Sequence, residues 1–249
     1  MPSRRNMLIF GSTCLACRAL AGGAFPRSVA PAGLPGSATA LGCGFEQVVK
    51  VPMARARLGS SGLRIADQVI ATESILLNRY FNVAPRLQYH DDNGAAEALT
   101  LRDHGGIYIT IGNSLIENEI TSDAETWRSV VIGILAHEWA HAFQYEHGLQ
   151  EKVYLWETHA DFLAGWYFGT RRAAENDQPN ATAFARALAA RANQSGYFDE
   201  NSHGNPAQRT EAMFAGLAFG SKHYVVRYGP DVDTAAGAGY AYVKKIRHS

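Results

Sequence analysis

The sequence predicts a mostly helical α+β fold, with one domain that carries a small β-sheet ahead of a long apolar helix. Two observations predict it. Residues 85–112 are rich in β-branched and aromatic side chains divided by two turn sequences, and hydrophobic residues at helical spacing lie on both sides of this stretch. The chain has 249 residues and no evident internal repeat, so it can form one large domain with a substantial core.

The composition argues against some classes of protein. The 23 basic and 23 acidic residues balance, so there is no basic excess of the kind that binds nucleic acid, and we expect no nucleic-acid partner. The three cysteines, Cys14, Cys17 and Cys43, all lie near the start of the chain. Cys14 and Cys17 form a CxxC, but no second pair of cysteines or histidines follows to complete a zinc site. Disulfides therefore cannot stabilise the rest of the chain.

Residues 1–24 resemble a bacterial export signal. A twin arginine, Arg4 and Arg5, precedes an apolar run and then small residues, a pattern similar to the twin-arginine signals. The apolar run is too short to span a bilayer, so we expect no stable membrane span in the mature protein. The pattern predicts an exported protein, periplasmic or extracellular. The alternative is a disordered extension on a cytoplasmic protein.

Residues 25–44 are rich in proline, glycine and alanine and predict a linker, which leaves 45–249 as the folded domain. At the start of this domain, residues 60–83 predict an amphipathic helix, with a serine cap ahead of its hydrophobic residues. Its hydrophobic residues recur at near-helical spacing, so we expect it to pack against the core.

Three strands are predicted next, from PRLQYH, AEALTL and GIYITIG, and the last two have the turn chemistry of a hairpin. An edge strand can pair with an extended peptide, and Ile107–Ile111 is our candidate for that role. A purely structural strand is the alternative. His90 and His104 lie in turn-like stretches and are expected to face solvent rather than to bind a metal.

A long helix is predicted from near Ser122 to Gly148. Ser122 and Glu125 have the spacing of a capping box, and a glycine commonly ends a helix. Apolar residues fill the first half of this stretch and surround the sequence HEWAH. Burying two histidines among such neighbours is costly unless something binds them.

The sequence HEWAH carries the chemistry that a metal-dependent hydrolase needs. His137 and His141 are four residues apart, which on a helix places them about 40° apart around the axis and about 6 Å along it. Both rings can therefore bind one zinc ion, while Glu138 lies to the side. In such a site the adjacent carboxylate takes a proton from the water that the metal activates.

A third ligand is expected from the next helix, VYLWETHADFLAGWYFG. Glu157 and Asp161 lie on one face, so Glu157 can bind the zinc and Asp161 can accept a hydrogen bond from a zinc-bound histidine. Two alternatives remain open. His147 has the metzincin spacing, but Gln144 stands where that motif has its glycine, and on a continuous helix His147 cannot reach the metal. His159 is the weaker alternative, because it points away from the face of Glu157.

Three stretches together carry a resemblance to a known family, namely HEWAHAFQ, ETHADFLAGWYFG and HGNPAQRTEAMFAGLAFG. The chain resembles the gluzincins, zinc peptidases with HExxH followed by ExxxD, and more narrowly a bacterial family of neutral zinc metallopeptidases. It departs from the family in the short gap between His141 and Glu157 and in Phe162, where a cysteine is common. The resemblance implies one Zn2+ ion on His137, His141 and Glu157.

The expected function is zinc-dependent hydrolysis of a peptide or protein substrate. Glu138 would act as general base and then as general acid, and His203 would donate a hydrogen bond to the developing oxyanion. For His203, a structural role at the entry of a helix is the alternative. Two other functions stay open: an amidase that acts on a non-protein amide, and a non-catalytic binding module stabilised by zinc.

The remaining C-terminal sequence predicts helices with less specific roles. Residues 180–196 are alanine-rich and predict a scaffold helix, and Pro206 lies in the first turn of another. Arg209 either pairs with a carboxylate near the site or is exposed. No motif is evident after Gly220, and nothing in the sequence indicates an oligomeric state.

Overall fold

The structure is a computed structural model. It describes residues 57–94, 96–103, 105–149, 153–175, 179–191, 205–223 and 231–246. The predicted export signal (1–24), the linker (25–44), His104 and His203 lie outside the described residues. Among the helices that are described, none has the length and apolar character needed to cross a membrane.

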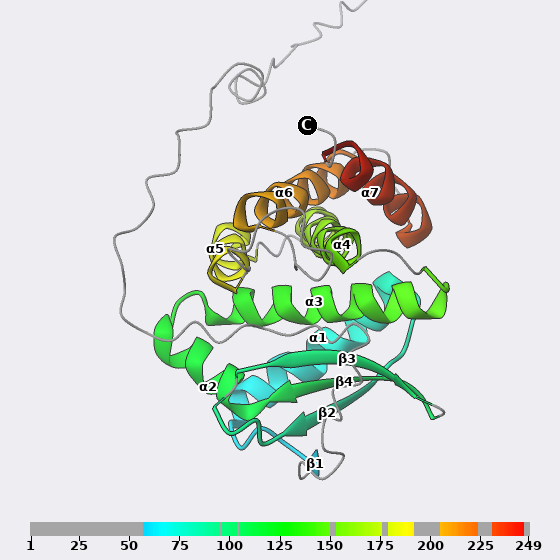
Figure 1. Cartoon of the computed structure of the whole chain (residues 1–249). Helices are drawn as coiled ribbons and strands as arrows, with labels where there is room; N and C mark the ends of the chain where they lie inside the picture. Colours follow the sequence, from blue (N-terminus) through cyan, green and yellow to red (C-terminus); the bar gives the residue numbers. More distant parts are fainter. Residues whose placement is uncertain are drawn as a thin grey trace, which may run out of the picture. The chain divides into compact units, whose positions relative to one another are not determined.

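The predicted α+β class is confirmed: the described residues form seven helices and one small sheet (Figure 1). The elements in order are β1 (Arg57–Leu58), α1 (Arg64–Phe81), β2 (Arg86–His90), β3 (Ala98–Asp103), β4 (Gly106–Gly112), α2 (Asn113–Ser122), α3 (Trp127–Glu146), α4 (Val153–Glu175), α5 (Ala181–Arg191), α6 (Pro206–His223) and α7 (Val232–Ile246).

The sheet has the strand order β1-β2-β4-β3. Strands β3 and β4 form the predicted antiparallel hairpin, with Thr100 opposite Ile109, while β2 and β4 run parallel. Because β4 is paired on both sides, the expectation that Ile107–Ile111 accepts an extended peptide is wrong. The edge strand on that side of the sheet is β3, which contacts α3.

Helix α3 begins later than its sequence predicts. Ser122 is the last residue of the separate helix α2, where its hydroxyl donates a hydrogen bond to the Asn118 carbonyl, and α3 begins at Trp127. The expected capping box is absent from this junction. Instead the Asp123 carboxylate accepts a hydrogen bond from the backbone N–H of Glu125, which stabilises the turn between the two helices.

Helix α3 is buried on every side over most of its length. All side chains from Val130 to Gln144 are buried, as expected for a helix that is apolar all round. It contacts α1, β3 and β4 below it and α4 and α5 above it in Figure 1. The helix ends at Glu146, and Gly148 adopts a left-handed φ of 61°, so the predicted stop is confirmed.

Helices α4 and α6 pack backbone against backbone. A Cβ atom added to Gly165 of α4 would overlap the carbonyl oxygen of Met213, and one added to Gly216 of α6 would overlap the carbonyl oxygen of Phe162. This close approach brings α6 within reach of the side chains that α4 buries. Because the two helices lie this close, Arg209 of α6 can reach Asp161 of α4.

We expect Gly165→Ala to destabilise the protein by about 1–3 kcal/mol, because the added methyl group meets rigid backbone of the facing helix. Urea denaturation measures the change in free energy of unfolding. Gly237→Ala in α7 is the matched control, since its Cβ would meet nothing within 4 Å. It should leave stability unchanged or raise it. Equal stabilities for the two variants would contradict the close packing.

Candidate metal centre

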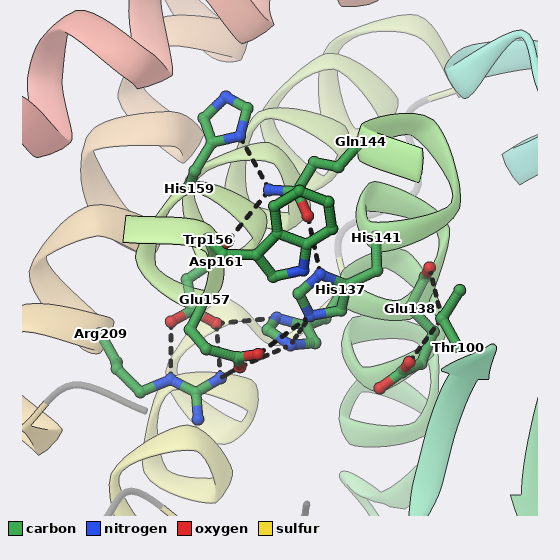
Figure 2. Close-up of polar contacts among 10 residues, drawn as sticks. All are labelled: Thr100, His137, Glu138, His141, Gln144, Trp156, Glu157, His159, Asp161 and Arg209. Atoms are coloured by element: carbon green, nitrogen blue, oxygen red, sulfur yellow. Dashed lines mark hydrogen bonds and ion pairs between the residues drawn. The ribbon is translucent and has the colours of Figure 1, made fainter. Parts of the chain in front are cut away.

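Three buried side chains converge between α3 and α4 (Figure 2). His137 and His141 face each other with their Nε2 atoms 3.0 Å apart. Glu157 of α4 lies opposite them, with Oε2 at 3.4 Å from His137 Nε2 and Oε1 at 3.4 Å from His141 Nε2. One ligand atom from each residue lies within 4.8 Å of the others. This group can hold a metal ion.

The chemistry of this group fits a divalent metal. Two imidazole nitrogens and one carboxylate oxygen suit first-row transition ions, and three protein ligands leave a coordination position for water or substrate. The three residues are at most 5% exposed. Burying a carboxylate against two imidazoles is costly unless a cation offsets the desolvation, so the arrangement favours a positively charged occupant.

Asp161 lies one turn beyond Glu157 on α4 and contacts the side of the His137 ring that is turned away from the candidate metal position. Its Oδ1 is 2.9 Å from His137 Nδ1, the ring atom that faces away from Glu157. Arg209 of α6 donates two hydrogen bonds to the Asp161 carboxylate, at 2.7 Å and 2.9 Å, and its Nη2 lies 3.6 Å from Glu157 Oε2. All three charged side chains are buried. With neutral imidazoles, two carboxylates against one guanidinium leave the centre electronegative, which favours a further positive charge, either a proton on His137 or a metal ion.

The pKa values in the metal-free protein follow from this charge distribution. Burial alone would lower the pKa of His137, but the Asp161 carboxylate, followed by Glu157, outweighs it and raises the pKa to about 10. Burial alone would raise the pKa of Asp161, but Arg209 and His137 hold it below its usual value. Without metal, His137 therefore carries a second proton at neutral pH, and a metal ion must displace that proton to bind.

His141 is held by a second set of contacts. Its Nδ1 lies 2.7 Å from Oε1 of Gln144, and its ring stacks on Trp156 with centroids 5.8 Å apart. The Gln144 amide nitrogen donates to the Trp156 carbonyl oxygen at 3.0 Å and lies 2.9 Å from His159 Nδ1. His159 Nε2 is 3.0 Å from the carbonyl oxygen of Ala236 in α7. The rings of His141 and His159 are both buried.

His159 is therefore placed outside the candidate ligand group. Its two ring nitrogens face Gln144 and the backbone of α7 rather than Glu157. Burial, together with the proximity of His141, lowers the pKa of His159 to about 4, so the ring is neutral. The alternative in which His159 binds the metal has no support in this geometry.

His147 and His90 also lie away from the group. His147 stacks on Phe143 at the exposed end of α3, with Nε2 at 3.7 Å from Asp233. His90 was expected to face solvent, and that expectation is wrong: it is 6% exposed, and its Nε2 lies 3.2 Å from Glu97 Oε1. His203, the expected oxyanion donor, lies outside the described residues.

Glu138 faces the strand β3 and lines a cavity beside the candidate metal ligands. The Thr100 hydroxyl lies 2.6 Å from Glu138 Oε2 and 2.9 Å from its backbone carbonyl oxygen. The cavity is small, with a volume of about 20 Å³, which is room for about one water molecule. Its lining consists of side chains from α3, α4, α5 and α6: Ile134, His137, Glu138, Glu157, Phe184, Ala187, Leu188, Arg191 and Arg209.

Two parts of this site were not predicted. Thr100, which orients Glu138, lies in a stretch that was predicted only as a strand. Helix α5 was predicted as scaffold, yet it supplies Phe184 and Leu188 to the cavity wall. Neither role has a local sequence pattern, because each depends on which elements pack together. The pairing of Arg209 with a carboxylate, one of two possibilities left open, is observed.

Comparison with known proteins gave no match among family models, curated proteins or solved structures.

Proposed function

We propose that this protein is a zinc-dependent hydrolase that cleaves peptide bonds, as its resemblance to the gluzincins suggests. The observation that carries the proposal is the position of Glu138, which lines the same cavity as His137 and Glu157. His137, His141 and Glu157 would hold one zinc ion. When bound, zinc supplies Lewis acidity, which lowers the pKa of water toward ~7 and polarises a carbonyl group.

Glu138 has the environment that a general base needs. Thr100 holds Oε2 by a hydrogen bond, so the carboxylate has a fixed orientation toward the cavity. In the proposed reaction Glu138 takes a proton from the attacking water on Oε1 and then delivers it to the leaving nitrogen. A purely structural metal site has no use for such a group, so its presence argues for catalysis over a non-catalytic binding module.

The surroundings of the site support an extended peptide substrate. Strand β3 is an edge strand, carries Thr100 and lies against α3, so a peptide that pairs with β3 would run beside Glu138. The cavity beside Glu138 has room for about one water molecule, the size of the attacking nucleophile, so the substrate itself would lie outside it. An amide that is not part of a protein could use the same groups.

An unbiased peptide library tests the proposed reaction. Full-length protein loaded with zinc should cleave a subset of peptides, and a chelator should abolish cleavage until zinc is restored. Cleavage that persists in the chelated protein would contradict a metal-dependent mechanism. Absence of cleavage in the zinc-loaded protein, with stoichiometric zinc bound, would favour the amidase or the binding module.

Zinc is also expected to stabilise the folded protein. Binding to the native state alone adds about 2.7 kcal/mol when free zinc is a hundred times Kd, so the thermal midpoint should rise on zinc addition and fall on chelation. Glu157→Gln should lose most of this shift, while His147→Ala should keep it. The reverse result would assign the third ligand to His147 and overturn the proposed site.

A further inference from the structure

The chain of hydrogen bonds behind His141 ends at two backbone carbonyl groups. One is the carbonyl of Trp156 in α4, which faces the Gln144 amide, and the other is the carbonyl of Ala236 in α7, which faces His159 Nε2 (Figure 2 shows all but Ala236). A carbonyl oxygen only accepts hydrogen bonds. The groups that face these two oxygens must therefore be donors.

These two donors determine which atoms donate and which accept in the hydrogen bonds that link His141, Gln144 and His159. The Gln144 nitrogen must face Trp156, so Oε1 faces His141, and His141 Nδ1 must be the donor. His159 donates from Nε2 to Ala236, so its Nδ1 accepts from the Gln144 amide. With Nδ1 of His141 protonated, the lone pair lies on Nε2, the atom that faces His137 and Glu157.

From this geometry we infer that Gln144 and His159 are positioning residues that hold His141 in its metal-binding tautomer, and that α7 takes part through the Ala236 carbonyl. The inference depends on the metal centre of the proposed function but not on peptide hydrolysis. Hydrogen bonds to the far nitrogen of a metal-bound histidine fix its ring orientation and raise its basicity. His137 receives this support from Asp161, whereas His141 receives it through an uncharged relay.

The relay has the burial that such a role requires. Gln144 is 1% exposed and His159 is 3% exposed, so water does not replace either partner readily. Neither side chain belongs to the candidate ligand group. Their contribution should therefore appear in metal affinity and in the electronic structure of the site.

The test compares Gln144→Leu, His159→Phe and the double variant by competition with a chromogenic chelator for zinc. We expect Gln144→Leu to weaken zinc binding by about 10- to 100-fold. His159→Phe should also weaken it, and the double variant should weaken it by less than the product of the two single effects. In cobalt-loaded protein, both single variants should shift the visible absorption bands. Thr170→Val, a buried change elsewhere on α4, is the control and should change neither affinity nor spectrum.

The outcomes separate this inference from the proposed function. If the wild-type protein binds no metal, both fail. If the wild type binds zinc and the folded variants bind it equally tightly with unchanged cobalt spectra, only the relay is overturned. Circular dichroism shows which variants fold. His159→Phe keeps Gln144 and its contact with Trp156, so it tests the relay even if Gln144→Leu does not fold.

Discussion

Replacement of Glu138 by glutamine is expected to lower kcat by about a hundred- to ten-thousand-fold while zinc remains bound. The amide has the same shape as the carboxylate, and its oxygen can still accept the hydrogen bond from Thr100. It cannot take a proton from water at neutral pH. The measurement is kcat on a peptide that the wild-type protein cleaves, together with the zinc content of both proteins.

Glu146→Gln is the matched control, because it makes the same chemical change at the exposed end of the same helix. It should retain wild-type activity. If Glu138→Gln keeps full activity with zinc in place, Glu138 is not the base and the proposed mechanism is wrong. If it loses zinc as well as activity, the residue contributes to metal binding, which the proposed mechanism does not include.

Local spacing predicted the elements that carry the candidate ligands. His137 and His141 share a face because they are one turn apart, and Glu157 and Asp161 share a face for the same reason. The hairpin of β3 and β4 also has a local cause in its turn chemistry. The break before Trp127 was missed, because the turn depends on the Asp123 side chain rather than on the apolar pattern.

The environment of the ligands depends on contacts between distant residues, and spacing alone could not predict it. Thr100 meets Glu138 across 38 positions of sequence, and His159 meets Ala236 across 77. In the sequence, Gln144 stood out only as part of the gluzincin-like stretch HEWAHAFQ and as the residue that replaces the metzincin glycine. Its hydrogen bonds to two different elements become evident once α4 lies against α3. A polar residue inside an otherwise apolar helix was the available signal.

Replacement of Arg209 by methionine is expected to destabilise the metal-free protein by about 3–5 kcal/mol, because it leaves two buried carboxylates with His137 as their one remaining cationic partner among these residues. Arg209 is 3% exposed, and Asp161, which accepts two hydrogen bonds from it, is fully buried. Urea denaturation of the chelated protein measures this loss. Arg186→Met, which removes an exposed arginine of α5, is the control and should change stability little.

Zinc should offset part of the loss in Arg209→Met, since a divalent cation supplies positive charge next to Glu157 and to the ring that Asp161 contacts. Adding Asp161→Asn to Arg209→Met should also recover stability, because the double variant buries one carboxylate fewer. Equal stability of Arg209→Met and the wild type without metal would mean that solvent, or the protonated His137 ring alone, offsets the charge of Asp161. The centre would then lack the electronegative, water-poor character that favours a bound cation.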